Sequence, residues 1–345
     1  TNGFGIKGEV KDNATWTSGS NTFPFVLIGL VTVTDGVTLT ISPGTIIKGV
    51  PSGNGELYVI GTLDINGTEG SNVVFTSIKD DTYGGDTNND GTATTPTPGD
   101  WYGIHLYGYE TNDGIGYFDF CRVRYGGNYG SSYDANIYFD LTDAGHFQNS
   151  LSEYSDEDGV KLLSSNPIIN NSTISNNDRH GIFGETGYIE SNTATITNNT
   201  FNNNGQYAVN ISNVRIQTYS GNTGSGNGTN GFGIKGEVKD NVTWTCGSST
   251  FPFVLIGLVT VIDGVTLTIS PGTIIKGLPS GNGELYVIGT LDVNGIEGSN
   301  VVFTSIKDDT YGGDTNNDGS ATSPTPGDWY GIHLYGNATN DGIGY

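Results

Sequence analysis

The sequence repeats itself over a long distance, because residues 1–117 return at 229–345 with about nine positions in ten identical. The segment TNGFGIKGEVKDN begins at Thr1 and again at Thr229, and differences such as Val50 to Leu278 are mild. Near-identity at one fixed offset is typical of an array of equal structural units. We therefore expect one complete unit at 1–228, followed by the first half of a second, near-identical unit at 229–345.

A shorter period lies inside the long one. INNSTISNN at 169–177 matches ITNNTFNNN at 196–204 at an offset of 27, and similar matches recur at an offset of 22. Short apolar runs alternate with Gly, Asn, Asp and Pro, and no segment keeps a helical period. These features predict an all-β fold, a parallel β-solenoid (β-helix) with rungs of ~22–27 residues. At that spacing a 228-residue unit holds about ten rungs, or roughly 50 Å of axis.

Stacked rungs explain the residue types in this pattern. We expect Ile169, Ile174, Ile196 and Phe201 to point inward and to form columns that fill a narrow core. The asparagines of the repeats, Asn171 and Asn198 among them, then lie in register at a corner. Asparagine tolerates left-handed backbone geometry, and stacked side-chain amides bond to one another along the axis. These asparagines are therefore interpreted as architectural.

The net charge restricts the possible partners. With 36 acidic and 13 basic residues the chain carries a formal charge of −23, which repels phosphate backbones and anionic lipid. We expect no nucleic-acid partner and no membrane insertion in this segment. Such a surface favours divalent cations, although solubility alone also explains an acidic composition. Cys246 replaces Ser18 of the first copy, so the two cysteines do not form a shared disulfide or metal framework, and Cys121 is expected to be a buried thiol.

Several stretches together resemble a known family. GVTLTISPGTIIKG at Gly36, the LYVIGTLDINGTEGSNVVFTS that follows, and GDWYGI at Gly99 are similar to bacterial secreted right-handed parallel β-helix proteins with the pectate-lyase-like fold. The likeness extends over nearly the whole chain, including YFDFCRVRYGG and NPIINNSTISNN. It implies an extracellular, right-handed, three-faced β-helix. It does not select a function, because this fold carries polysaccharide lyases, glycosidases, tailspikes, adhesins and structural surface proteins.

The sharpest motif is DTNNDG at 86–91, which returns at 314–319. Oxygen side chains at positions 1, 3 and 5, followed by Gly at position 6, match the start of a calcium-binding loop. The bidentate Glu of position 12 is missing, because Thr97 and Thr325 stand there. Neighbouring carboxylates, which include Asp100 and Asp328, are candidates to replace it. The alternative is an acidic turn that needs no metal.

We expect the ion to be Ca2+ and its role to be the ordering of a long loop that bulges from the solenoid at 79–99. The expected ligands in the first copy are Asp86, Asn88 and Asp90, the backbone carbonyl of Thr92, and Asp80 and Asp81. Those in the second copy are Asp314, Asn316 and Asp318, the carbonyl of Ser320, and Asp308 and Asp309.

A catalytic interpretation has weaker support. Acidic residues at 156–158 lie beside Lys161, one rung from DRH at 178–180, and carboxylates near basic residues are what polysaccharide lyases and glycosidases use. Charged residues also belong at solenoid corners, so we expect no enzyme activity. Trp16, Trp101 and their copies Trp244 and Trp329 offer sugar-stacking platforms if they are exposed, but packing over the core is the commoner role.

These observations lead to one functional expectation. A faithful tandem array of stacked rungs suits a structural segment of a fibre, stalk or adhesin shaft on a cell surface. Its expected partners are neighbouring copies or repeats that meet end to end, and lateral contacts between rods are a further option. A carbohydrate-binding adhesin that contacts glycans is the first alternative, and a lyase or hydrolase is the second.

Overall fold

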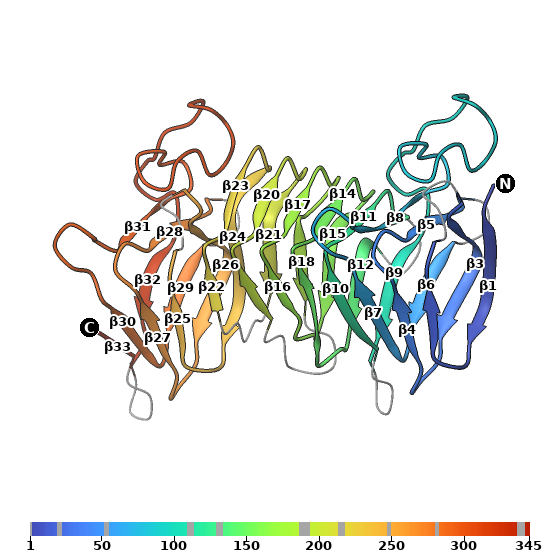
Figure 1. The fold of residues 1–345 in the computed structure, drawn as a ribbon. Helices are drawn as coiled ribbons and strands as arrows, with labels where there is room; N and C mark the ends of the chain where they lie inside the picture. Colours follow the sequence, from blue (N-terminus) through green and yellow to red (C-terminus); the bar gives the residue numbers. More distant parts are fainter. Residues whose placement is uncertain are drawn as a thin grey trace.

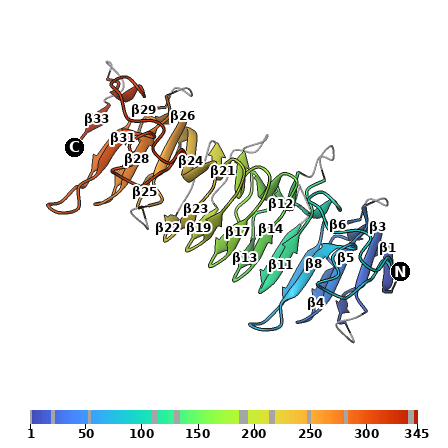
Figure 2. The same cartoon turned by 90° about the horizontal axis from the view of Figure 1, so that it is seen from above.

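A computed structural model describes residues 2–18, 23–51, 55–108, 114–128, 134–185, 194–212, 218–246, 250–279, 283–336 and 342–345. The chain winds into a parallel β-solenoid of about 11 turns. Figure 1 shows an elongated rod with the two termini at opposite ends, and Figure 2 shows the same rod from above. No α-helix occurs among these residues, so none in the described ranges is long and apolar enough to cross a membrane.

Each coil of the solenoid places strands on three faces, numbered here 1 to 3. Face 1 carries β5 (Ile46–Gly49), β8 (Val73–Ser77), β11 (Cys121–Arg124), β14 (Leu151–Glu153), β17 (Thr173–Ser175), β20 (Thr200–Asn202), β23 (Thr223–Ser225), β28 (Ile274–Gly277) and β31 (Val302–Ser305). Face 2 carries β1 (Phe4–Val10), β3 (Phe25–Val33), β6 (Glu56–Val59), β9 (Gly103–Tyr107), β12 (Ala135–Asp140), β15 (Asp158–Leu163), β18 (Ile182–Glu185), β21 (Tyr207–Ser212), β24 (Thr229–Val238), β26 (Phe253–Val261), β29 (Glu284–Val287) and β32 (Gly331–Leu334). Strands β3 and β26 are long enough to pair on both faces, which joins faces 1 and 2 into a 21-stranded sheet.

Face 3 consists of two sheets that meet at the junction between the copies. The 8-stranded sheet contains β2 (Ala14–Trp16), β4 (Thr38–Ile41), β7 (Thr62–Asn66), β10 (Ile115–Asp119), β13 (Gly145–Gln148), β16 (Ile168–Asn170), β19 (Thr195–Thr197) and β22 (Thr218–Ser220). The 4-stranded sheet contains β25 (Val242–Trp244), β27 (Thr266–Ile269), β30 (Thr290–Val293) and β33 (Ile343–Gly344). All pairings between these strands are parallel.

Face 2 carries the strand pairing through the junction without a break. Strand β21 pairs with β24, and β24 pairs with β26 in the register that β1 and β3 use in the first copy. Eight successive pairings lead from β1 to β24. The unit therefore contains eight coils, and the expectation of about ten was wrong. The difference arises because long excursions such as 79–99 consume residues without adding a rung.

The predicted core columns are confirmed. Ile169 pairs with Ile196 on face 3, and Ile174 pairs with Phe201 on face 1; all four side chains are fully buried. Successive coils in this region are separated by 22, 27 and 23 residues, as the sequence period predicts. Cys121 lies buried in the core, and both cysteines are free thiols. The right-handed sense of the coil and the division at residue 228 stay predictions.

Two kinds of asparagine occupy the corners: those with left-handed backbone geometry and those that form the amide ladders. The sequence analysis had assigned both features to the same residues. Asn171 and Asn198 adopt φ values of 50° and 56°, the left-handed geometry expected of them. The buried amide ladders, however, are formed by the residues that follow such positions. In one ladder Asn199 donates its backbone N–H to the side-chain oxygen of Asn222 at 3.0 Å. A second ladder runs through Asn177, Asn204 and Asn227.

Candidate metal centre

The excursion at 79–99 joins β8 to β9, and its copy at 307–327 joins β31 to β32. Both loops, teal and orange-red in Figure 1, project from the same side of the rod. Each begins beside the buried end of a face 1 strand and returns to the solenoid at a buried or half-buried tryptophan, Trp101 or Trp329. The solenoid therefore presents one such loop in each copy of the repeat.

The DTNNDG turn folds around the carboxylate of its first residue. Asp86 Oδ1 accepts a hydrogen bond from the Asp90 backbone N–H at 3.0 Å, and Asp86 Oδ2 accepts one from Gly91 N–H at 2.9 Å. Asn89 and Gly91 have positive φ values of 61° and 72°, which closes the turn tightly. The Asn88 side chain donates to Asp90 Oδ2 at 2.7 Å. These bonds within the motif shape the local backbone.

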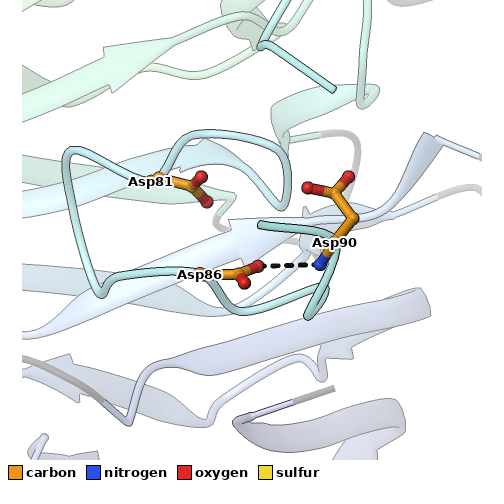
Figure 3. A group of neighbouring side chains, drawn as sticks. All are labelled: Asp81, Asp86 and Asp90. Carbon is orange, nitrogen blue, oxygen red and sulfur yellow. Dashed lines mark hydrogen bonds between the residues drawn. The ribbon is translucent and has the colours of Figure 1, made fainter. Parts of the chain in front are cut away.

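Three carboxylates converge on this turn. Asp81, Asp86 and Asp90 each offer an oxygen, and these oxygens lie within 4.8 Å of one another (Figure 3). Asp309, Asp314 and Asp318 form the same triad in the second copy. Burial, followed by the negative charge of Asp86, raises the pKa of Asp81 above its ordinary value. A divalent cation would relieve this repulsion, and hard carboxylate and amide oxygens are the ligands that calcium takes.

Several oxygens in the turn have no hydrogen-bond donor. Asp81 Oδ1, Asn88 Oδ1 and Asp90 Oδ1 are shielded from solvent and accept no hydrogen bond. Asp309 Oδ1 and Asn316 Oδ1 are in the same state in the second copy. Shielded oxygens without a donor are costly unless something else coordinates them. The two triads could therefore hold a metal ion. Asn88 and Asn316 each add an amide oxygen without a donor to the turn.

The structure divides the predicted flanking ligands into two groups. Asp81 and Asp309 join the triads, but Asp80 and Asp308 do not. Asp80 is buried and accepts hydrogen bonds from Thr76 Oγ1 at 2.6 Å and from Thr82. Asp308 is held in the same way by Thr304 Oγ1 at 2.6 Å. The fold thus places only one member of each Asp-Asp pair in a triad, because the other carboxylate turns to these hydroxyl groups. That Asp80 and Asp308 bind the ion stays a prediction.

Asp100 and Asp328, which were candidates to replace the missing position 12, close the base of each loop instead. Asp100 accepts a hydrogen bond from Lys79 Nζ at 2.6 Å and another from Ser77 Oγ at 2.6 Å. Asp328 has the same partners in the second copy, Lys307 and Ser305. The Lys307 bond is the largest of the contacts that lower the pKa of Asp328. Thr92 and Ser320 have exposed side chains, and the role of their carbonyls stays a prediction.

A buried lysine beneath each loop escaped the sequence analysis. Lys48 has no exposed surface, and its Nζ donates to the backbone carbonyls of Asp80 and Gly85 at 2.9 Å each. Lys276 repeats both bonds beneath the second loop. Burial lowers the pKa of Lys48 and of Lys276 to about 8. The sequence does contain a signal for this lysine, because it is the one charged residue within the apolar strand TIIKG of each copy.

The residues that gave the catalytic alternative lie near one another, and several of them pair with each other. Asp158 has no exposed surface, accepts a hydrogen bond from His180 N–H at 3.1 Å, and has a pKa raised to about 7 by burial. Arg179 is paired with Glu157 at 2.7 Å. Lys161 Nζ lies 3.6 Å from Asp134 and 5.0 Å from the ring centre of Tyr138. The basic groups thus pair with carboxylates inside and beside the cluster, and the Asp158 side chain is fully buried.

Most of the tryptophans pack inward, as the commoner role predicts. Trp16, Trp101 and Trp244 are buried, and Trp101 stacks on Phe75 with ring centres 6.4 Å apart. Partly exposed aromatic rings lie instead on face 2. There Tyr58 stacks on Tyr107 at 6.1 Å, and the second copy repeats this pair at 5.7 Å.

Comparison with known proteins adds no relative. No protein-family model, no curated protein and no solved structure matches this chain.

Proposed function

We propose that this chain is a segment of an extracellular fibre, stalk or adhesin shaft, and that its role is mechanical. The observation that carries the proposal is the unbroken pairing β21–β24–β26, which passes from one copy of the repeat into the next. Units that share a continuous sheet lengthen a rod, whereas units joined by a tether make separate globules. The near-identical copies support the same role, because each junction then needs the same interface.

Calcium is the ion that we propose for both triads. Each site combines three carboxylates with an unpartnered amide oxygen in a surface turn. Calcium accepts six to eight oxygen ligands in irregular geometry, whereas magnesium demands a near-ideal octahedron. Bound calcium would fix the excursion at 79–99 to the rod and make it resist proteases. The ion therefore has a stiffening role and no catalytic one.

Electron microscopy of a lengthened chain tests the mechanical proposal. Insertion of one further 228-residue unit after residue 228 adds eight coils, so the rod should lengthen by roughly 40 Å at constant width. A chain in which the inserted unit is preceded by a flexible Gly/Ser linker serves as the control, because it breaks the shared sheet. Particles that look like two beads in both cases would refute a continuous shaft.

Calorimetric titration tests the calcium proposal. We expect two sites of similar affinity for Ca2+, weaker binding of Mg2+, and slower proteolysis at 79–99 and 307–327 once Ca2+ is present. The solenoid itself should keep its β-sheet circular dichroism in chelator, because the loops lie outside the core. Unchanged proteolysis with and without chelator, together with no heat of binding, would contradict the proposal.

A carbohydrate-binding adhesin is the second candidate, and the stacked pair Tyr58–Tyr107 favours it. The pair recurs as Tyr286–Tyr335, so a rod would present one such pair in each repeat. Partly exposed aromatic rings on a regular surface are suited to stacking against sugars. A glycan array probed with the wild-type chain and with Tyr107→Ala separates the possibilities. Hits that the substitution abolishes would support glycan binding, and an array with no hits would exclude it.

A further inference from the structure

The backbone of the second loop is bonded to the first strand of its own copy. Asn230, which lies in β24, donates its backbone N–H to the carbonyl of Thr315 at 2.7 Å. Its side-chain amide donates to the carbonyl of Asp314 at 3.1 Å. Asp314 is also a member of the triad, and its carboxylate holds the backbone of the turn. Asp314 therefore has two roles: its side chain would bind the proposed cation, and its backbone carbonyl accepts the hydrogen bond from Asn230.

The opposite side of Asn230 meets the preceding copy. Its side-chain oxygen accepts hydrogen bonds from Asn227 at 2.9 Å (backbone N–H) and 3.0 Å (side-chain amide). Asn227 accepts from Asn204 at 3.0 and 2.8 Å, and Asn204 accepts from Asn177 at 2.8 Å. These side chains are at least nine-tenths buried. Asn230 is thus the last member of a ladder that crosses the junction between the copies and ends on the loop.

We propose that Asn230 couples the cation site of one repeat to the amide ladder of the repeat before it, so that cation binding strengthens the junction. This proposal rests on cation binding at Asp314, as proposed above. The ion holds the Asp314 carboxylate and with it the turn, so the two carbonyls stay within reach of Asn230. A buried amide network gains from being complete, because a missing partner leaves its neighbours with unsatisfied polar groups. Thermodynamic linkage then requires that an intact ladder also favours the bound ion.

The first copy provides a matched comparison within the described residues. Asn2 donates its backbone N–H to Thr87 at 2.7 Å and its side-chain amide to Asp86 at 3.2 Å, so its contacts with the loop match those of Asn230. Asn2 is exposed, and no ladder asparagine among the described residues bonds to it. The contrast also appears in the neighbouring side chains, because Phe4 is 60% exposed whereas Phe232 is 2% exposed. The preceding coil is what buries the second copy of this surface.

Hydrogen exchange of the full chain, measured by mass spectrometry with and without Ca2+, tests the coupling. In the wild type we expect Ca2+ to slow exchange in peptides that contain the Asn204 and Asn227 amides by about fivefold or more. Asn230→Ala should abolish this protection while the triad at Asp314 keeps its ligands. Asn2→Ala removes the equivalent contact with the other loop, and it should leave the protection of the ladder intact.

A second variant guards against simple misfolding of Asn230→Ala. Asn230→Asp keeps an oxygen that accepts from Asn227 but loses the donor to the Asp314 carbonyl, so it separates the ladder from the loop. We expect it to lose the Ca2+-dependent protection as well. Calcium binding by calorimetry without any change in ladder exchange would overturn the coupling alone. The absence of calcium binding in the wild type would overturn both the coupling and the proposed role of calcium.

Discussion

The loops 79–99 and 307–327 have almost the same sequence but different neighbours. Their internal bonds agree closely: Asp90 N–H and Asp318 N–H each lie 3.0 Å from the carboxylate of the first residue of the turn. Lys48 and Lys276 donate to the equivalent carbonyls at 2.9 Å. The loop therefore takes its shape from its own residues and from the strand beneath it.

The neighbours differ on both sides of the loops. On the first loop, Asp80 lies 3.3 Å from Arg124, which is itself 3.0 Å from Glu153 on the following coil. Arg122 and Arg124 both lie 5.6 Å from the ring centre of Tyr83. The positions that correspond to these arginines, 228 residues further on, lie beyond residue 345. The second loop instead receives the amide ladder through Asn230. The two loops thus share one internal geometry, while their described neighbours differ.

Removal of the first ligand of either turn should have the largest effect. Asp86→Ala and Asp314→Ala each delete one carboxylate and the two backbone bonds that shape the turn. We expect roughly 100-fold weaker calcium binding at the altered loop and one remaining site by calorimetry. Asp64→Ala, which removes an acidic side chain of face 3, is the control. If either substitution silenced both loops, the two sites would not be independent.

Loss of the buried lysine should affect the two loops equally. Lys48→Met or Lys276→Met leaves two buried or partly buried carbonyls without donors, which costs about 3 kcal/mol of local stability. Limited proteolysis should then cleave the loop above the substitution roughly 100-fold faster than in the wild type. The unaltered loop in the same molecule serves as the internal control. Unequal effects of the two substitutions would show that neighbouring coils, not the lysine, determine the geometry.

Arg124→Ala should distinguish the loops. It leaves the carboxylates of Asp80 and Glu153 without their cation, although Asp80 keeps its bonds to Thr76 and Thr82. We expect a loss of about 1 to 2 kcal/mol that is confined to the first loop. Proteolysis at 79–99 should accelerate roughly tenfold, while cleavage at 307–327 stays unchanged. Equal acceleration at both loops would contradict the assigned difference.

The pH dependence should be the smallest effect and alike in both loops. Burial and nearby carboxylates raise the folded-state pKa of Asp81 and of Asp309 above the ordinary 3.8. Without the ion, their contribution to stability is therefore greatest below that value and is lost as pH rises through the raised pKa. Calcium needs the ionised form, so its affinity should fall as pH is lowered through the same window.

Calorimetric titrations at a series of pH values that begins below 3.8 measure this dependence. Asp81→Asn and Asp309→Asn should each flatten it at their own loop. A profile that is identical in the wild type and both variants would exclude these carboxylates as the titrating groups.

Much of the fold was predictable, because each coil of a solenoid repeats the same short pattern of apolar and turn residues. Columns such as Ile169 over Ile196 follow from apolar residues that recur at the length of one coil. The number of coils was overestimated, because an excursion and a coil consume residues alike. The asparagines were assigned to the correct corner, but the ladder belongs to the residues after the left-handed positions. The left-handed residue turns the chain at the corner, and the residue that follows it forms the side-chain bonds to the adjacent coil.

Within the candidate site, sequence and structure contributed separate parts. The oxygens at 86, 88 and 90 were predictable, because their spacing and the glycine at 91 act within six consecutive residues. Whether Asp80 or Asp81 joins them was not, since adjacent side chains point to opposite sides and only Thr76, Thr82 and Arg124 decide which side is inward. The support from Lys48 and the bond between Asn230 and Asp314 were likewise hidden, because they connect residues 32 and 84 positions apart.

The amino-acid sequence by itself determined the repeat, the rung period and the turn that gathers carboxylate oxygens, since each depends on contacts between near neighbours or on one recurring interval. The tertiary structure alone decided which carboxylates face the turn, which lysine is buried beneath it, and which amide ladder reaches it. Those choices depend on stacking, which brings distant coils within hydrogen-bonding distance and excludes water from the groups between them.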